Sequence, residues 1–279
     1  MRIVTDSASD ITAEQAKAMN IDVISLEINF DDGPCPQKTE DDFALFYERL
    51  KKCINLPITS RPAPQDYLEI YLDAKKKNDE VLVLTVSSGL SGTIETAVVA
   101  KEMAEYDRIY IVDSHQAILT QRMLVQQAVR MRDEGKSARE IADHIKEIRD
   151  DVVVCGVVGT LKYLQKGGRV PASMALLGQV MSIKPVIVLE DKILKQLGKA
   201  RGYAAGISLL HKRIEEDGFD SSQPMLFGFT SDRQYGEMLM EKTCKKFGVA
   251  QSELYPVGGI IGTHCGTDCM AVAYLKKRS

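Results

Sequence analysis

Two patterns of apolar and polar positions take turns along the first half of the chain. Short, unbroken apolar runs at residues 3–5, 81–86 and 109–112 predict strands that are covered on both faces. Residues 23–30 alternate strictly, which predicts one further strand with a single buried face, near a sheet edge. Amphipathic stretches separate these runs, so the pattern indicates an α/β fold with a parallel sheet.

Capping residues mark where several helices begin. Thr12 and Gln15 form a Thr-x-x-Gln capping box, which begins a helix reaching Met19, and Ser137 and Glu140 form a second capping box. Further helices are predicted over residues 40–52, 65–77, 93–104 and 116–133. The three prolines between positions 57 and 64 exclude a helix there and favour an extended loop.

The pattern changes near residue 150. Strands are predicted at residues 152–158, 185–189, 226–230, 254–257 and 270–274, with helices at residues 204–216 and 234–247. Residues 167–181 are typical of a glycine-rich loop that leads into a helix. We therefore predict two domains: an N-terminal α/β domain over residues 1–150, with a parallel, Rossmann-like sheet, and a C-terminal α+β domain over residues 151–279.

Composition narrows the classes of function. The 279 residues are 44% hydrophobic, so the chain can bury a large core without a metal or a disulfide. A net charge of −3 argues against a nucleic-acid-binding protein that depends on phosphate contacts. No apolar run approaches the roughly 20 residues that span a bilayer, and the chain begins on a strand-like segment without a signal-peptide core. We expect a cytoplasmic protein with no transmembrane segment.

The cysteines fit that compartment. They are scattered along the chain and are expected to be reduced thiols: Cys35, Cys53, Cys155, Cys244, Cys265 and Cys269. Cys265 and Cys269 lie near His264, but a C-x3-C spacing without a second pair matches a metal site poorly. We predict neither a metal nor a cofactor.

The strongest candidate site is the strand, loop and helix of residues 81–104. In an open parallel sheet, ligands bind at the carboxyl ends of the strands. The loop of residues 87–92 offers backbone N–H groups at the positive end of a helix, and Ser87, Ser88 and Ser91 add hydroxyls. This pattern fits a phosphate or carboxylate site; the alternative is a tight turn that only caps the helix.

Three other segments carry candidate polar groups. Thr59 and Ser60, held between prolines, either complete a carboxylate cradle or form a simple turn. His264 lies among glycines, which argues against packing in an apolar core and suits a base, a hydrogen-bond donor or a charge partner. Arg169 follows two glycines and offers a guanidinium to an anion, unless it is only solvated. Two histidines on predicted helices are expected at the surface: His144 and His211.

Six segments, in this order and at compatible spacing, resemble the motifs of DegV proteins, a family of bacterial fatty-acid-binding proteins. They are residues 3–10, 59–62, 87–93, 167–170, 183–185 and 261–266, with the sequences IVTDSASD, TSRP, SSGLSGT, GGRV, IKP and IGTHCG. The resemblance covers nearly the whole chain. It implies two α/β-type domains with a long-chain fatty acid between them and its carboxylate at the polar end of the site.

The resemblance also implies a partner. Several members are binding subunits of a bacterial fatty acid kinase and present the carboxylate to a separate, ATP-dependent catalytic subunit. Arg169 matches an exposed arginine of the family, which implies that it faces this kinase subunit.

The resemblance assigns the ligand contacts as well. Thr59 or Ser60, together with Ser91, would bind the carboxylate, helped by backbone N–H groups around Gly92. His264 would lie near the carboxylate, directly or through water.

The chain departs from the family in two segments. Arg61 and Ala63 stand where Gln and then Ser are usual, and Gly266-Thr267-Asp268 stands where Gly-Pro-Gly is frequent after the histidine. A carboxylate at position 268 would repel a bound carboxylate unless its side chain points away.

The main alternative is a serine-dependent hydrolase or acyltransferase that uses Ser91 and His264. The hydrolase elbow needs Gly-x-Ser-x-Gly, whereas residues 89–93 are Gly-Leu-Ser-Gly-Thr, which lacks one residue before the second glycine. Burial of about 14 methylenes, at about 0.8 kcal/mol each, stabilises a fatty acid complex by on the order of 10 kcal/mol before association costs. Residues 176–188 supply apolar side chains for a tunnel. We therefore expect a lipid-binding protein rather than an enzyme.

Overall fold

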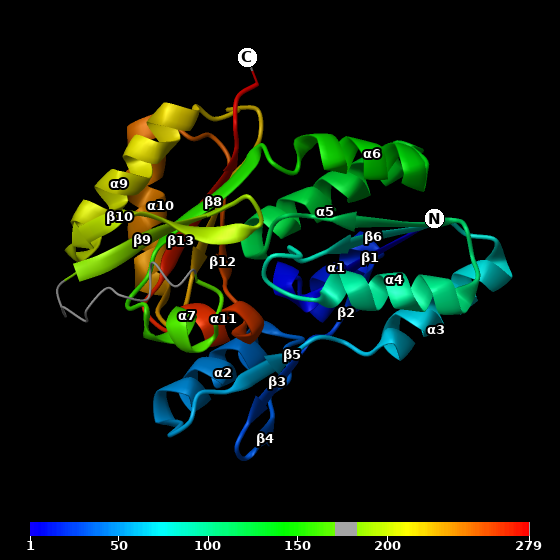
Figure 1. The fold of residues 1–279 in the computed structure, drawn as a ribbon. Coiled ribbons are helices and arrows are strands. Elements are labelled where there is room, and N and C mark those ends of the chain that lie inside the picture. The colour runs from blue at the N-terminus through cyan, green and yellow to red at the C-terminus, as the bar shows by residue number, and fades with distance from the viewer. Residues whose placement is uncertain (171–182, 279) are drawn as a thin grey trace.

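A four-stranded parallel sheet forms the first layer of the computed structural model, which describes residues 1–170 and 183–278 (Figure 1). The strand order is β2 (Asp22–Ile24), β1 (Arg2–Asp6), β6 (Val81–Thr85) and β7 (Ile109–Asp113). Every residue of β6 is buried, because helices cover both faces of the sheet. The predicted parallel sheet is therefore present, and the carboxyl ends of its strands share one edge.

Alternate side chains of this sheet face two helical layers. Val4 and Val83 pack against one pair of helices, and Ile3 and Leu82 pack against the other pair. The two pairs are α3 (Pro64–Lys77) with α4 (Thr93–Ala104), and α5 (Ile118–Asp133) with α6 (Ala138–Ile148). The capping boxes predicted at the starts of α1 (Ala13–Met19) and α6 are both present.

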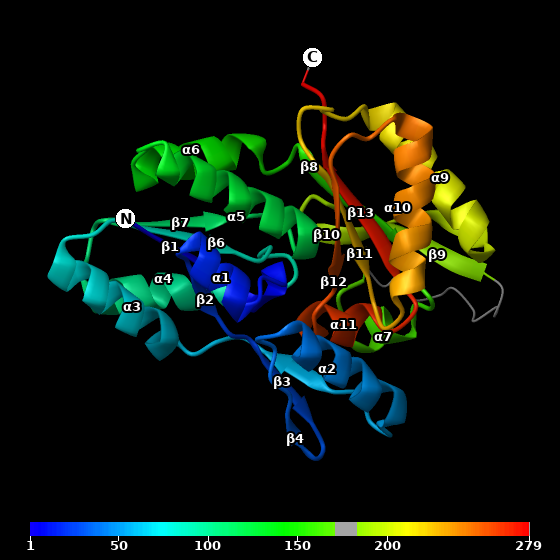
Figure 2. The ribbon, with the colours of Figure 1, turned by 180° about the vertical axis from the view of Figure 1, so that it is seen from behind.

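A six-stranded mixed sheet forms the second layer. Its order is β10 (Ile193–Arg201), β9 (Ile183–Glu190), β8 (Val152–Val157), β13 (Met270–Leu275), β11 (Met225–Phe229) and β12 (Ser252–Pro256). The β11–β12 pair is parallel, and the other neighbouring pairs are antiparallel. Two helices cover the face that points away from the first sheet (Figure 2): α9 (Gly202–Asp217) and α10 (Arg233–Phe247). The α/β fold class, with a parallel sheet and a separate mixed sheet, is confirmed.

A small antiparallel sheet lies below the two larger sheets in Figure 1, and three helices lie beside it. Its strands are β4 (Gly33–Pro34), β3 (Glu27–Phe30) and β5 (Ile58–Ser60), and the helices beside it are α2 (Glu40–Lys52), α7 (Lys162–Lys166) and α11 (Gly259–Cys265). The prediction of one strand over residues 23–30 is wrong, because β2 and β3 belong to different sheets. At the break, the Leu26 N–H donates to the Ser7 hydroxyl at 2.9 Å instead of to a neighbouring strand.

The glycines around His264 belong to the short helix α11 and to the residues that flank it. Its glycines allow close packing on α2: a Cβ on Gly259 would lie 2.6 Å from the ring of Phe46, and one on Gly262 would lie 2.6 Å from the hydroxyl of Tyr47. Glycine here permits contact between two helices rather than a flexible loop. The local sequence does not reveal this contact, because the aromatic partners lie more than 200 residues away.

Three further predictions concern His211, the segment of residues 167–181 and the domain boundary. His211, expected at the surface, is buried in α9, with its Nε2 3.0 Å from the hydroxyl of Thr243. The helix expected within residues 167–181 falls mainly on residues 171–182, outside the described residues, as does the apolar side chain of Leu176. The domain boundary at residue 150 stays a prediction.

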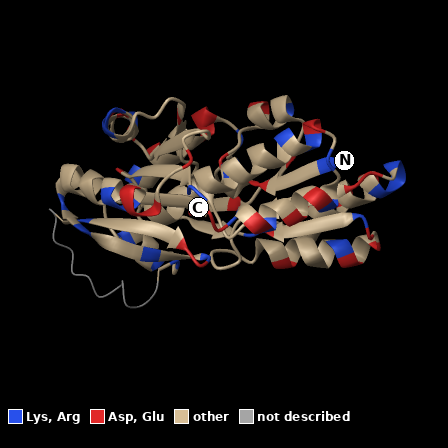
Figure 3. Cartoon of the chain, turned by 90° about the horizontal axis from the view of Figure 1, so that it is seen from above, with Lys and Arg blue, Asp and Glu red and all other residues tan. Residues whose placement is uncertain are grey.

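The exterior carries charges of both signs. Basic and acidic residues are interspersed along the helices of both layers (Figure 3), in keeping with the net charge of −3. In the part of the chain that the structure describes, no helix combines the length and apolar character needed to cross a membrane.

Candidate ligand-binding site

An apolar cavity lies between the parallel sheet and the mixed sheet. Its volume, counted as the space open to the centre of a water molecule, is about 140 Å³. On the same measure, one water molecule needs roughly 10–15 Å³. The parallel sheet contributes the segments after the carboxyl ends of its strands, with Ala8, Val86, Leu90, Ala117 and Ile118 in the wall. This is the edge at which a ligand site was predicted from the sheet pattern.

The mixed sheet supplies the opposite wall because its strands alternate. Val153 and Val157 of β8 pack with the outer helices and do not line the cavity, whereas Val154 and Gly156 line it. Cys155 packs with the outer helices and is also among the residues that line the cavity. Ile187 and Leu189 of β9 are paired with these two positions and line the cavity too. Of the described residues expected to supply an apolar tunnel, Ile187 and Val188 line the cavity, whereas Ile183 and Val186 do not.

Polar side chains from four separate segments meet in the cavity wall. They are Thr59, Ser60 and Arg61 of β5 and the residue after it, Ser91 of the loop before α4, Arg169 after α7, and His264 of α11. Thr59, Arg169 and His264 also line a neighbouring depression of about 330 Å³, together with Lys166. These three side chains therefore stand between the apolar cavity and a more polar opening.

Thr59 and His264 are in direct contact. The Thr59 Oγ1 lies 3.0 Å from the His264 Nε2. Burial and the nearby charge of Arg169 lower the pKa of His264 to about 4, so the imidazole is neutral at pH 7. Its Nδ1 is buried and has no hydrogen-bond partner among the described residues. A Cβ on Gly167 would lie 2.2 Å from this nitrogen, so the backbone of Gly167 closes over the ring.

Ser91 and Ser60 differ in what their hydroxyls contact. The Ser91 Oγ lies 2.9 Å from the Thr93 Oγ1, in the first turn of α4 and beside the cavity. The Ser60 hydroxyl donates to the Glu27 carboxylate at 3.1 Å on the outer side of the small sheet. Of the two neighbouring hydroxyls in β5, that of Thr59 is therefore the one turned to the other polar groups.

The remaining predicted site residues lie close by. Gly92 precedes α4 and is not among the described residues that line the cavity; a Cβ there would lie 2.9 Å from the Arg61 guanidinium. Arg169, expected to be exposed, is half-buried, and its Nε donates to the Leu90 carbonyl at 3.2 Å. Asp268 points away, since its carboxylate oxygens accept from Ser231 at 3.3 Å and from Thr267 at 3.0 Å.

A nucleophile and its general base should be linked by a hydrogen bond. Among the described residues, the His264 Nε2 is linked to Thr59, and the Ser91 hydroxyl is linked to Thr93. The arrangement thus offers neutral hydroxyl and imidazole groups beside an apolar cavity. Neutral donors of this kind satisfy a carboxylate that would be costly to bury unpaired.

Sequence reasoning missed the residues that hold the site together. Asp6 is fully buried and accepts from the Val86 N–H at 2.7 Å and from the Gln121 amide at 3.1 Å, directly beneath the loop of residues 87–92. Burial raises the pKa of Asp6 to about 6, although these hydrogen bonds oppose the shift. An acidic residue at the carboxyl end of the first strand was the available signal.

The thiols of Cys265 and Cys269 belong to the cavity wall. The Cys269 Sγ lies 3.2 Å from the Cys265 carbonyl oxygen, and both residues line the cavity. All six cysteines are free thiols. Within residues 1–170 and 183–278, no group of three or more His, Cys, Asp or Glu side chains is arranged to hold a metal ion.

Comparison with known proteins shows the family to which the chain belongs. The sequence model of the DegV family matches residues 1–277. The chain belongs to the DegV family. It is 31% identical, over 99% of its length and 98% of the relative's, to a DegV domain-containing protein of Caldanaerobacter subterraneus.

Solved structures of DegV proteins share the fold. A fatty-acid-binding DegV family protein from Thermus thermophilus is 26% identical and superposes with a TM-score of 0.87, over 99% of this chain and all of the other. The Streptococcus pneumoniae fatty acid kinase B3 protein, loaded with linoleic acid, has a TM-score of 0.85 over 99% of both chains. At 20% identity, that second likeness concerns the fold alone.

Proposed function

We propose that this DegV protein binds a long-chain fatty acid in the apolar cavity and is not itself an enzyme. The carboxylate would be held by the hydroxyls of Thr59 and Ser91 and by backbone N–H groups around Gly92. The observation that carries the proposal is the meeting of Thr59, Ser91 and His264 in the wall of a cavity whose lining is mostly apolar. The fatty acid bound by the Thermus thermophilus relative supports it.

His264 would direct the hydroxyl of Thr59. With a neutral imidazole, one ring nitrogen carries a proton and the other a lone pair. If the proton is on Nε2, it is donated to the Thr59 Oγ1 across the observed 3.0 Å, and the Thr59 O–H is then free to donate to the carboxylate. In this tautomer, the buried Nδ1 has only a lone pair unsatisfied, which costs less than an orphaned N–H. Ser60 would take no direct part, because its hydroxyl is bonded to Glu27.

The bound carboxylate would be presented to a separate, ATP-dependent fatty acid kinase subunit in the cytoplasm. The depression beside Thr59 and His264 gives a reacting group access from outside, and Lys166 and Arg169 line it. A guanidinium in that position suits a phosphoryl group or an acidic side chain of the partner. The fatty acid kinase protein of Streptococcus pneumoniae, with its shared fold, is in keeping with this role.

Lipid extraction tests the binding function first. Protein purified without detergent and extracted with organic solvent should release fatty acids detectable by mass spectrometry. Delipidated protein should bind a labelled C16 or C18 fatty acid saturably at one site per chain. No released lipid, together with no saturable binding, would contradict the proposal.

The kinase role needs its own assay. With a bacterial fatty acid kinase catalytic subunit and ATP, the loaded protein should support formation of acyl phosphate, and Arg169→Ala should reduce that rate by a larger factor than it reduces fatty acid affinity. The matched control is Arg139→Ala, on the exposed face of α6. Equal rates with and without the DegV protein would contradict presentation while leaving lipid binding intact.

A further inference from the structure

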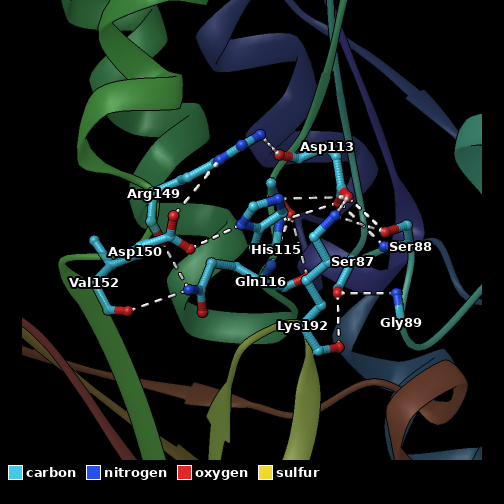
Figure 4. Close-up of polar contacts among 11 residues, drawn as sticks. Ser87, Ser88, Gly89, Asp113, His115, Gln116, Arg149, Asp150, Val152 and Lys192 are labelled. Carbon is cyan, nitrogen blue, oxygen red and sulfur yellow. Dashed lines mark hydrogen bonds and ion pairs between the residues drawn. The ribbon is translucent and has the colours of Figure 1, made fainter.

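The turn between β9 and β10 contacts the serine loop that precedes α4. Lys192, in this turn, places its Nζ 3.1 Å from the Asp113 carboxylate and 3.4 Å from the Ser88 hydroxyl (Figure 4). The Ser87 hydroxyl donates to the Lys192 carbonyl at 2.8 Å. A residue of the mixed sheet thus binds the carboxyl ends of two strands of the parallel sheet, across the cavity.

Asp113 holds the same loop from the opposite side. Its carboxylate accepts from the Ser88 N–H at 3.1 Å, the Ser88 hydroxyl at 2.6 Å and the His115 N–H at 3.1 Å. The side chain is 11% exposed. Burial alone would raise the pKa of Asp113, but the hydrogen bonds from Ser88, His115 and Lys192 prevail and lower it. The ionised carboxylate is therefore the state in which this network is complete.

The approach of the turn to the loop is close at the backbone. A Cβ on Gly89 would lie 2.3 Å from the Lys192 carbonyl oxygen, so only glycine fits at this point. Leu90 and Ser91, the next two residues of the loop, line the cavity, and so does Leu194 after the turn. A displacement of the turn relative to residues 87–89 should therefore also displace Ser91, which follows two residues later.

The connection between the layers is anchored at the same place. The His115 Nδ1 lies 2.8 Å from Asp150, and the Gln116 amide donates to the carbonyls of Arg149 at 2.8 Å and Val152 at 3.2 Å (Figure 4). These contacts fix the chain where it passes from α6 to β8. Residues 113–116 therefore contact both the chain segment that joins the two sheets, through Asp150 and Val152, and the turn that carries Lys192. Both walls of the cavity are attached to this segment.

The conformation of the turn is unusual for the residues it holds. Asp191 has a φ of 49° and Lys192 a φ of 71°. Two-residue hairpin turns with positive φ at both positions favour Asn-Gly or Asp-Gly, because glycine adopts this region at no steric cost. Glycine would adopt the φ of Lys192 with less steric strain, so the turn itself does not favour lysine. The contacts of its side chain with Asp113 and Ser88 are what lysine adds at this position.

We propose that Lys192 is a positioning residue for the carboxylate site. By binding Asp113 and Ser88 from the opposite wall, it fixes the loop of residues 87–91 so that Ser91 faces the head group of the ligand. The inference rests on the proposed function, since it concerns the same ligand. It assigns to Lys192 no contact with the ligand itself.

Comparison of an acid with an alcohol of equal chain length tests this role. The alcohol fills the apolar cavity but lacks the carboxylate that the loop recognises. Lys192→Met should weaken binding of a C16 fatty acid by roughly three- to tenfold and leave binding of the C16 alcohol within about twofold. Lys192→Arg, which keeps the charge, should restore most of the acid affinity. Lys199→Met is the matched control, because it removes an exposed lysine from the same hairpin.

A double-mutant cycle with Ser91→Ala separates positioning from direct attraction. If Lys192 acts through Ser91, Lys192→Met should cost less than about twofold in the Ser91→Ala background, because the group it positions is absent. Full multiplication of the two effects would overturn the inference and indicate that the lysine charge attracts the ligand independently. Equal weakening of acid and alcohol would overturn it as well, as a defect of the cavity wall.

The affinities of the wild-type protein separate a failure of the proposed function from a failure of the proposed role of Lys192. If the wild type binds neither acid nor alcohol, the proposed function fails. If it binds the acid more tightly than the alcohol and Lys192→Met changes neither affinity, the proposed function stands and the role of Lys192 is wrong.

Discussion

The Thr59 hydroxyl and the His264 imidazole lie 3.0 Å apart, although 205 positions separate them in the chain. Thr59 belongs to β5, a short strand of the small sheet, and His264 belongs to the last turn of α11. Their contact depends on packing of α11 against α2, which Gly259 and Gly262 permit. The Thr59–His264 pair is therefore assembled where the small sheet meets α11, whereas Ser91 and the apolar walls come from the two large sheets.

The Thr59 hydroxyl can be tested with two variants of similar size. Thr59→Val removes the hydroxyl and keeps the shape, so a charge-assisted hydrogen bond worth about 1.5–3 kcal/mol is lost and fatty acid affinity should fall about ten- to a hundredfold. Thr59→Ser retains the hydroxyl and should stay within a few-fold of wild type. Isothermal titration with one fatty acid on all three proteins makes the comparison, and equal affinities for Val and Ser would show that the hydroxyl does not bind the ligand.

Ser91 distinguishes a binding site from a hydrolase. Ser91→Ala should weaken fatty acid binding by about ten- to a hundredfold, because one charge-assisted bond is lost while the apolar chain still binds. Neither the wild type nor the variant should hydrolyse acyl esters. Ester turnover by the wild type that disappears in both Ser91→Ala and His264→Ala would contradict a binding role and favour the hydrolase alternative.

The low pKa of His264 makes a prediction about stability and pH. The folded protein takes up this proton only near pH 4, whereas the unfolded chain takes it up near the ordinary value of 6.5. Between these values the unfolded state binds more protons, so the contribution is complete above pH 6.5 and is lost as pH falls toward 4. His264→Gln should lack this dependence. Melting temperatures from pH 4 to 8 should therefore fall more steeply in the wild type than in the variant, and parallel curves would contradict the shift.

Asp10 should behave in the opposite sense. Burial raises its pKa to about 7, although the Gly258 backbone and the charge of Arg122 oppose the shift. The folded protein thus keeps a proton that the unfolded chain releases near the ordinary value of 3.8. Its contribution is complete below pH 3.8 and is lost as pH rises toward 7. Relative to Asp10→Asn, the wild type should lose free energy of unfolding over that range; a constant difference between the two proteins would show that Asp10 is ionised throughout.

Local patterns were sufficient for most of the first layer. The apolar runs of β1 and β6 are buried on both faces, so their sequence carries the burial directly, whereas Tyr110 and Ile111 of the edge strand β7 are only half-buried. The capping boxes of α1 and α6 are formed by neighbouring residues, and no distant contact is needed to place them. The serine loop was found as a candidate site because the carboxyl edge of a parallel sheet follows from strand order.

The errors have a common physical cause in distant partners. Residues 23–30 keep one alternating pattern of burial while crossing from one sheet to another, and only the position of Ser7 at Leu26 reveals the break. β10 was missed because Lys195 and Lys199 interrupt its apolar pattern and the register shifts before Gly198. Lys192 showed no motif at all, since its role depends on the parallel sheet that lies across the cavity.

The affinity of the wild-type protein for a C16 fatty acid, measured beside its affinity for the C16 alcohol at pH 7.5, tests the central claim most directly. If the polar groups in the cavity wall recognise a carboxylate, both ligands should bind at one site and the acid should bind at least about tenfold more tightly. Equal affinities would show that the cavity recognises only an apolar chain, and absence of saturable binding for both would contradict the account.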